Sequence, residues 1–347
     1  MRITLITMLL AASTIGGAAA QGVSTFASVN AACPELRHTV MSLIAIGRLA
    51  EAELKVSAVL DSSGDHAQES CAGLILSNVA VFMSISGRSA DAERLAERAV
   101  LILEKTYSAN ARELLRPLET LAASRLEQGK TAKAREAFKR IQAIRIEQPE
   151  DSALVHGIAA ALLQAEGNLA EAEIQYLASL RVWEGAGQGE TADAGAAFNG
   201  LGLVYIQEQR LTEARQVLDH ALAIFSRAKD AAPMDRIKVL HCRGAVHARQ
   251  GDWRRAEQDF RDALAIADQE PSVDRVVLRS LLTNYAYLLR KNRHRREARA
   301  IQARAEGIPA DPAMSAVIDV SDLLAKPKLG KKTDPGGSAA DTHTNRQ

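Results

Sequence analysis

The residues that could do chemistry in this sequence are few, and they form no catalytic or metal-binding pattern. The chain has eight histidines and three cysteines but contains no H-E-x-x-H, C-x-x-C or G-x-S-x-G motif. His241 and His247 lie in one helical pattern, where six residues turn a side chain by about 240°, so their imidazoles cannot share a ligand-binding face. Gly185–Gly189 resembles a phosphate loop, but it follows a helical pattern and no Lys-Ser/Thr follows it. We therefore expect no enzymatic activity, no cofactor and no bound metal.

Composition and charge indicate which elements carry these residues. The 347 residues include 63 Ala but only 2 Trp, 5 Tyr and 6 Phe. Because Ala favours helices and strands favour β-branched and aromatic residues, a β-sandwich or barrel is excluded. Lys and Arg (43) nearly balance Asp and Glu (42). The overall charge therefore indicates neither a nucleic-acid nor a membrane partner.

The first twenty residues have the pattern of an export signal. Arg2 precedes an apolar stretch, Ile3–Leu10, and small residues follow, ending in Ala18–Ala20. This order is typical of a secretory signal peptide cleaved after Ala20. An uncleaved membrane anchor is the alternative, but it needs a longer apolar run to cross about 30 Å of hydrocarbon. We expect residues 21–32 to be a short linker. We also expect a periplasmic or secreted protein with no stable membrane insertion.

A short phrase recurs along the rest of the chain. It reads Gly-Arg-Leu-Ala-Glu-Ala at residues 47–52 and Gly-Asn-Leu-Ala-Glu-Ala at residues 167–172, with related forms in five other places. The alanine that ends each phrase lies at position 52, 92, 134, 172, 214, 256 or 298. Self-similarity at a period of about 42 residues is the signature of a repeat architecture. We therefore expect one array of seven units rather than two domains.

Each phrase lies between two segments with helical periodicity. In the fifth unit, Phe198, Leu201 and Tyr205 form an apolar stripe before the phrase, and Ala214 and Leu218 belong to another after it. Steps of three and four place such residues on one helix face. The glycine of the phrase ends the first helix, where a left-handed residue is needed. The pattern predicts an all-α protein built from pairs of antiparallel helices.

This pattern resembles the tetratricopeptide repeat. The fifth unit matches that motif but has Leu218 where the family has an aromatic residue; the matching residues are Phe198, Leu201, Gly202, Tyr205, Ala214 and Ala221. The period of about 42 residues is similar to the kinesin-light-chain-like subclass. The resemblance covers residues 33–306. It implies an α-solenoid, a right-handed superhelix of about seven antiparallel helix pairs, in an exported bacterial-type protein.

The helical pattern stops after residue 306. Residues 307–347 are polar and rich in Pro, Gly and Lys, and we expect them to be mostly disordered. A short apolar island, Val317–Val320, interrupts this tail. Because a terminal repeat needs its open side covered, we expect this island to cap the last helix pair.

The cysteines have a structural interpretation. Export makes disulfides permissible. Cys33 and Cys71 each lie at the start of a first helix, about one unit apart, so stacking of neighbouring units would bring their sulfurs together. We predict a Cys33–Cys71 bridge, with two isolated buried thiols as the alternative. We expect Cys242 to be buried in its helix.

The resemblance also implies where a ligand binds. In the family, the first helices line a concave groove, and positions beside the packing stripe contact the ligand. The corresponding residues here are Asn199, Lys238, His241, Arg249, Tyr287, Arg290 and Lys291. Asn can bond a peptide backbone through both its donor and its acceptor, and Lys and Arg attract carboxylates. The expected partner is another protein or peptide.

Charge is unevenly distributed along the chain. Residues 227–304 carry 18 Lys and Arg against 10 Asp and Glu. Either these are solvated helix faces, or they form a basic groove for an acidic peptide or envelope polymer. Nucleic acid is disfavoured by export and by the lack of interleaved aromatic residues. The favoured function is a non-enzymatic scaffold that binds an extended peptide segment. A structural cell-envelope assembly scaffold that uses its convex face or tail is the alternative.

Overall fold

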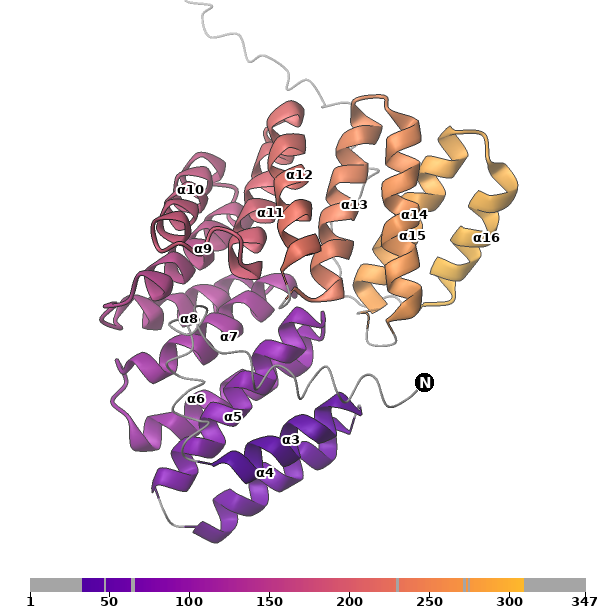
Figure 1. Cartoon of the computed structure of the whole chain (residues 1–347). Helices are drawn as coiled ribbons and strands as arrows, with labels where there is room; N and C mark the ends of the chain where they lie inside the picture. The colour runs from indigo at the N-terminus through magenta and orange to yellow at the C-terminus, as the bar shows by residue number, and fades with distance from the viewer. Residues whose placement is uncertain are drawn as a thin grey trace, which may run out of the picture.

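The computed structural model describes residues 33–308, except 47, 64–65, 229–230, 271–272 and 274, as an array of helix pairs (Figure 1). Within this part of the chain there are fourteen α-helices, one 3-10 helix and no strand. The first helices of the pairs are α3 (Pro34–Ala45), α5 (His66–Ile85), α7 (Leu115–Glu127), α9 (Pro149–Ala165), α11 (Ala192–Gln207), α13 (Pro233–Arg249) and α15 (Arg275–Lys291). The second helices are α4 (Leu49–Ser63), α6 (Ser89–Thr106), α8 (Thr131–Gln142), α10 (Leu169–Gly185), α12 (Leu211–Arg227), α14 (Trp253–Gln269) and α16 (Arg295–Glu306). The predicted all-α solenoid of seven helix pairs is confirmed. The predicted signal peptide, linker and most of the tail lie outside the described residues.

The turn within each pair follows the recurring phrase. A residue with positive φ ends the first helix in six pairs, at Gly87, Gly129, Gly167, Gln209, Gly251 and Arg293. Gln209 and Arg293 hold φ 66°, although a side chain makes this conformation cost about 1–2 kcal/mol. The next residue closes the turn by donating its N–H five residues back, as in Arg210 N to Tyr205 O at 2.9 Å. The phrase therefore encodes a backbone conformation even where glycine is replaced.

Small residues allow the helices to approach closely. A Cβ on Gly202 of α11 would lie 2.8 Å from the Leu218 side chain of α12, the other helix of its pair. A Cβ on Gly200 would lie 2.3 Å from the Tyr176 ring of the preceding pair. The alanine that ends the phrase is buried in all seven pairs. The abundance of Ala thus serves helix contacts both within and between pairs.

The first helices form the inner layer of the array. Backbone contacts join α3 to α5, α5 to α7, α7 to α9, α9 to α11 and α11 to α13, whereas no comparable contact joins second helices of the described pairs. The first helices are therefore closer together than the second helices. We call the surface presented by α7, α9, α11 and α13 the first-helix face.

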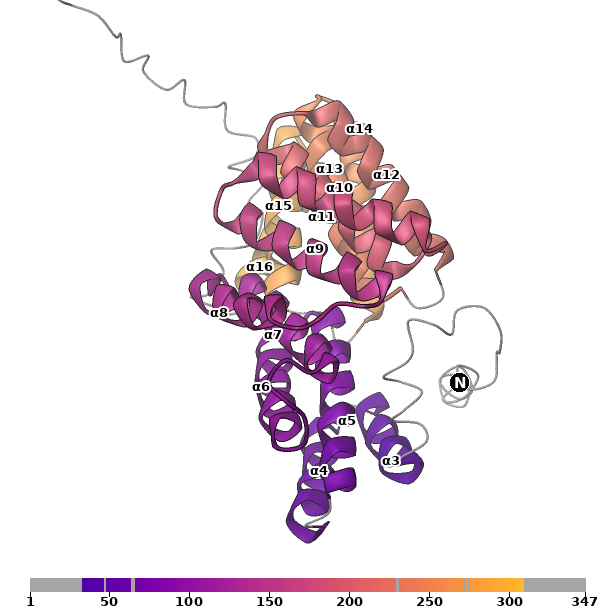
Figure 2. The same cartoon turned by 90° about the vertical axis from the view of Figure 1, so that its left-hand side faces the viewer.

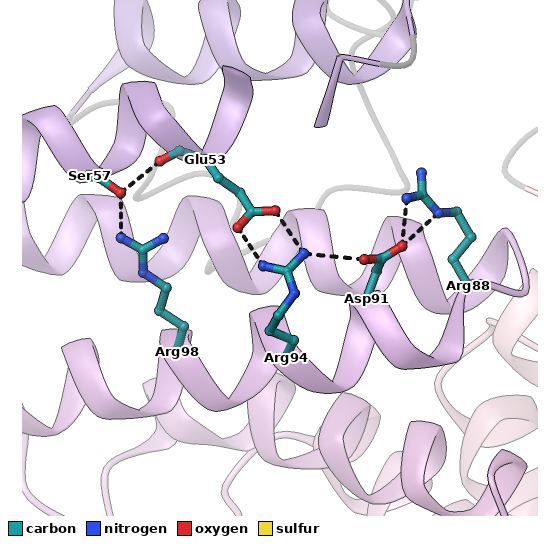
Figure 3. A network of polar contacts seen from close by, with 6 residues as sticks. All are labelled: Glu53, Ser57, Arg88, Asp91, Arg94 and Arg98. Carbon is teal, nitrogen blue, oxygen red and sulfur yellow. Dashed lines mark hydrogen bonds and ion pairs between the residues drawn. The ribbon is translucent and has the colours of Figure 1, made fainter. Parts of the chain in front are cut away.

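Arginine side chains span the wider spacing between second helices. Arg94 of α6 donates to both carboxylate oxygens of Glu53 on α4, and Arg98 donates to Ser57 Oγ (Figure 3). Similar ion pairs join α6 to α8 and α14 to α16. Because exposed pairs contribute about 0–1 kcal/mol each, they orient the outer layer more than they stabilise it.

The array changes direction at its third pair. Figures 1 and 2 show α7 and α8 between the arm formed by α3 to α6 and the arm formed by α9 to α16. The buried core is continuous from α3 to α9 and separates into further clusters beyond it. This change of direction brings α7 near the beginnings of helices that come much later in the sequence.

Candidate functional site

Ion pairs on the first-helix face join helices that are far apart in the sequence. Lys238 Nζ on α13 donates to Glu127 Oε1 at the end of α7 over 2.8 Å, although the two residues are 111 positions apart. At the start of α7, Arg116 Nη1 donates to Glu119 Oε2 over 3.0 Å, and Arg116 Nη2 lies 3.6 Å from Asp193 Oδ2 on α11. We call the ion pairs formed by these five residues the cross-array ion pairs. They link the third helix pair to the fifth and sixth.

The surroundings of α7 shift the titration of two of these groups. Burial raises the pKa of the Glu119 carboxyl, and the nearby carboxylates of Asp193 and Asp151 raise it further, while Arg116 opposes them. Burial also disfavours the charged form of Arg116, but Glu119 and Asp193 outweigh that effect and raise its pKa. Both side chains remain partly exposed. A charged ligand that binds beside α7 would therefore change the pKa values of Arg116 and Glu119 together.

The structure places Asn199 and Lys238 on two first helices that contact each other. Asn199 is on α11 and is partly buried, and its Oδ1 has no hydrogen-bond partner among the described residues. Lys238, on α13, is 32% exposed and bonded to Glu127. Of the predicted groove residues, Lys238 is the one that takes part in the cross-array ion pairs.

The prediction that His241 lines the groove is wrong. Its side chain is 5% exposed, its Nε2 lies 2.6 Å from Asn284 Nδ2 on α15, and its ring packs edge-on against Phe260 of α14. Burial lowers its pKa to about 4. The helical period correctly placed His241 beside the packing stripe, but α15 of the next pair covers that position. His241 is therefore a neutral core residue.

Arg249 also makes contacts within the scaffold. It ends α13 and donates to the Ile206 carbonyl of α11 over 3.3 Å and to the Gln209 side chain. These bonds attach the sixth pair to the turn of the fifth. Arg249 thus contributes to the junction between pairs.

The remaining three predicted residues lie together on the last helix pair. The Arg290 guanidinium carbon is 6.0 Å from the Tyr287 ring centroid, and Lys291 Nζ is 5.4 Å from it, which is within cation–π range. Arg290 also donates to Gln302 of α16 over 3.3 Å. The seven predicted groove residues therefore divide among the first-helix face, the packing between pairs and the end of the array.

Two family profiles, both described as tetratricopeptide repeat, match the chain. The first matches residues 72–147 and 151–228, and the second matches residues 237–267, so the matches cover more than half of the chain. The chain belongs to the tetratricopeptide repeat family. This confirms the resemblance seen in the sequence.

Solved structures agree with the tetratricopeptide-repeat fold. A Rap protein complexed with competence and sporulation factor aligns with a TM-score of 0.55 at 16% identity, covering 87% of this chain and 78% of that one. The APC/C hetero-tetramer Cut9-Hcn1 aligns with a TM-score of 0.55 at 13% identity, covering 83% of this chain and 48% of that one. BtubC (BKLC) from P. vanneervenii aligns at 20% identity with a TM-score of 0.48, covering 75% and 97% of the two chains. No curated protein matches the sequence significantly. At these identities, the first two alignments support the fold alone.

The sequence reasoning missed four of the five residues that form the cross-array ion pairs, although the repeat contains a signal for two of them, Arg116 and Glu119, which occupies the place of Asn199 and His241. Arg116 in the third pair and Lys238 in the sixth occupy the same place, each eighteen residues before the alanine of its phrase. Both form ion pairs across the array. Arg116 could therefore have been found by carrying the position of Lys238 back through the repeats. Glu127 and Asp193 carry no such signal, because their partners depend on the change of direction at the third pair.

His247 lies on a different side of α13 from His241, as the helical period predicted. Its Nδ1 is 3.0 Å from Asp259 Oδ2 on α14, and Arg243 Nη2 donates to Asp259 Oδ1 over 2.6 Å. Both His247 and Asp259 are buried. This network attaches α13 to α14 within the sixth pair. The described residues contain no group of His, Cys, Asp and Glu side chains arranged to hold a metal ion.

The structure brings Cys33 and Cys71 together as a disulfide, with their Cα atoms 6.3 Å apart. The bond joins the residue preceding α3 to α5. Cys242 is buried, as expected, and burial raises the pKa of its thiol to about 12.

Helix α5 is also the one described helix with the length and hydropathy of a membrane span, but 61% of its apolar window is buried inside the array. Its apolar character is that of a core helix.

Proposed function

We propose that this tetratricopeptide-repeat protein is a non-enzymatic scaffold that binds an extended peptide segment along its first-helix face. Family membership supports protein–protein interaction in general. The observation that carries the finer proposal is the ion pair between Lys238 and Glu127, whose side chains are 32% and 34% exposed. Lys238 already binds a carboxylate, and solvent reaches both partners. A peptide carboxylate can therefore replace Glu127 at the same ammonium group.

This exchange makes Glu127 an internal competitor. In the free protein Lys238 is neutralised by its own chain, and in the complex by the peptide. Because one charge-assisted bond replaces another of the same kind, the exchange costs little, and the rest of the peptide supplies the net affinity. Removing the lysine and removing its competitor should therefore change the affinity in opposite directions.

Two variants test this proposal. A peptide selected from a displayed random library on the full chain serves as the probe, and its Kd is measured by fluorescence anisotropy. We expect Lys238→Met to weaken binding about tenfold, the loss of one bond to a charged group. We expect Glu127→Gln to strengthen binding, because the competing carboxylate is neutralised.

Matched variants come from the second-helix layer. Arg94→Met and Glu53→Gln remove an inter-pair ion pair of the same kind between α4 and α6, and we expect both to leave the Kd unchanged. Equal weakening by Lys238→Met and Glu127→Gln would mean that their pair only supports the fold, and would refute the proposal. Affinity unaffected by either variant would also refute it.

We also infer that the protein works outside the cytoplasm, in an oxidising compartment. The export pattern in residues 1–20 and the pairing of Cys33 with Cys71 support this inference. Alkylation of the protein directly in cells, followed by peptide mapping, provides the test. We expect Cys33 and Cys71 to be protected until a reductant is added. Free thiols at both positions would reject the inference.

A further inference from the structure

The positive charge of the C-terminal region is concentrated on the last helix pair. Residues 275–304 contain nine Lys and Arg and one acidic residue, Glu297, whereas residues 227–274 contain nine of each sign. The basic excess found across residues 227–304 therefore belongs to α15 and α16. It does not extend along the first-helix face.

These charges line a pocket of about 470 Å³ at the end of the array. Arg290 comes from α15, and Arg295, Arg299, Gln302 and Glu306 come from α16. Arg295 and Arg299 are four residues apart, about one helical turn, and both are exposed. Among the described residues, neither arginine forms an ion pair.

The pocket lies on the side where a further helix pair would pack. Ala303 and Glu306 line it and occupy the repeat positions that Asp219 and Leu222 hold in the fifth pair. There, Asp219 accepts a bond from Arg243 of the sixth pair, and Leu222 packs against the core of the sixth and seventh pairs. The last pair thus presents arginine and glutamate on a surface that, in the fifth pair, contacts the next helix pair.

We propose that residues 311–324 of this chain dock in the pocket and cover it. This segment contains Asp311, Asp319 and Asp322 and no Lys or Arg, and its apolar island is Val317–Val320. Asp319 and Asp322 complement the exposed Arg295 and Arg299, and carboxylates form bidentate bonds with guanidinium groups. The pocket is lined by the guanidinium groups and the aliphatic chains of the arginines. The aspartates therefore bind the guanidinium groups, while the apolar residues of the segment pack along the aliphatic chains.

The chain leaves the described part at the right place for this docking. Arg279 Nη1 on α15 donates to the Ile308 carbonyl over 3.2 Å, so the segment begins on the same helix pair. The twelve residues of α16 extend about 18 Å, and six extended residues reach about 20 Å. Residues from 314 onward can therefore lie anywhere along the pocket. Tethering gives the segment an effective concentration of about 1 mM.

The segment neutralises the basic surface and blocks stacking of a second array on it. If the free segment binds with a Kd of about 0.1 mM, tethering keeps it docked about ten times as often as undocked.

Hydrogen exchange of the full chain tests the proposal by charge reversal. In the wild-type chain we expect amides in residues 314–324 to exchange about tenfold more slowly than in either of two double variants. One double variant is Arg295→Glu with Arg299→Glu. The other is Asp319→Arg with Asp322→Arg. Combining the four substitutions should restore the protection. Reversal of Lys331 and Lys332 to Glu, outside the segment, is the matched control and should change nothing. Unchanged exchange in α13 and α14 shows that each variant is folded.

Three results would overturn the proposal. Unprotected amides in the wild-type chain would mean that the segment does not dock. Protection that increases with protein concentration would identify a second copy as the occupant. Protection that survives both charge reversals would mean that the apolar island caps the array without recognition of its aspartates by the arginines.

Discussion

Acidification provides a sharp test of the buried environment of His241. Asn284 Nδ2 lies 2.6 Å from His241 Nε2, and an amide nitrogen donates. Nε2 must therefore accept, which requires the neutral imidazole. A proton on Nε2 would face the amide N–H groups in a buried site beside the Phe260 ring. We expect the last two helix pairs to lose stability when the pH is lowered.

The magnitude follows from the pKa of His241. Burial lowers it from 6.5 to about 4, and each unit of difference is worth about 1.4 kcal/mol, so protonating the folded state costs about 3 kcal/mol. Above pH 6.5 His241 is neutral in both states, and the full stability is present. As the pH falls from 6.5 towards 4, the unfolded chain gains a proton that the folded chain rejects, and stability falls. Below pH 4 this residue causes no further loss.

A local probe is needed because repeat arrays unfold in segments. Native-state hydrogen exchange of α13 and α15 amides, measured at pH 7.5, 6 and 5 and corrected for intrinsic rates, reports the opening free energy of this region. His241→Gln keeps a polar partner for Asn284 but does not titrate, so it should remove most of the pH dependence. Asn284→Asp should reverse the dependence, because a carboxylate favours the imidazolium. His66→Gln changes an exposed histidine and serves as the control.

The outcome that refutes the reasoning is an equal loss of stability in wild type and His241→Gln. The acid sensitivity would then belong to carboxylates elsewhere. A wild-type stability that does not change between pH 6.5 and 5 would also refute it. Titration of the His241 ring followed by NMR would separate these cases, because it reports the pKa of this residue directly.

Three further substitutions or treatments test the packing. Gly200→Ala places a Cβ 2.3 Å from the Tyr176 ring and should lower the free energy of unfolding by about 1–3 kcal/mol, measured in urea. Arg293→Gly relieves a left-handed residue at φ 66° and should raise stability by up to about 1 kcal/mol, seen as slower hydrogen exchange in α15 and α16. Reduction of the Cys33–Cys71 bridge, whose residues are 38 positions apart, should destabilise the first two pairs by about 4 kcal/mol on the chain-entropy estimate, measured as a lower melting temperature.

The helix pairs could be predicted from the sequence because their boundaries are encoded locally. The glycine in five of the seven phrases predicted a left-handed residue at the end of the first helix. Gln209 and Arg293 take the same conformation without glycine, because the closing hydrogen bonds and the flanking helices impose it. The phrase alanines were equally informative, since a small residue is required wherever two helices approach closely. Periodicity therefore determined the units and their number.

The change of direction at the third pair could not be predicted in the same way. Helices α7 and α8 have 13 and 12 residues, whereas α9 and α10 have 17 each. The start of α7 contacts the beginning of α11 through Arg116 and Asp193, and its end contacts α13 through Glu127 and Lys238. Periodicity describes contacts between neighbouring units. It contains no information about the bond between Lys238 and Glu127, which lie three units apart.

Position within the repeat is also insufficient to define a binding residue. Glu119, Asn199 and His241 occupy the same place in the third, fifth and sixth pairs. Glu119 forms an ion pair with Arg116, and His241 is enclosed with Asn284. Asn199 has a buried oxygen without a hydrogen-bond partner in the described part of the chain. What differs is the neighbour: the next first helix brings Asn284 to His241, whereas Arg116 lies beside Glu119 on the same helix. A family position therefore predicts which helix face a side chain occupies. The adjoining unit decides whether a ligand can reach it.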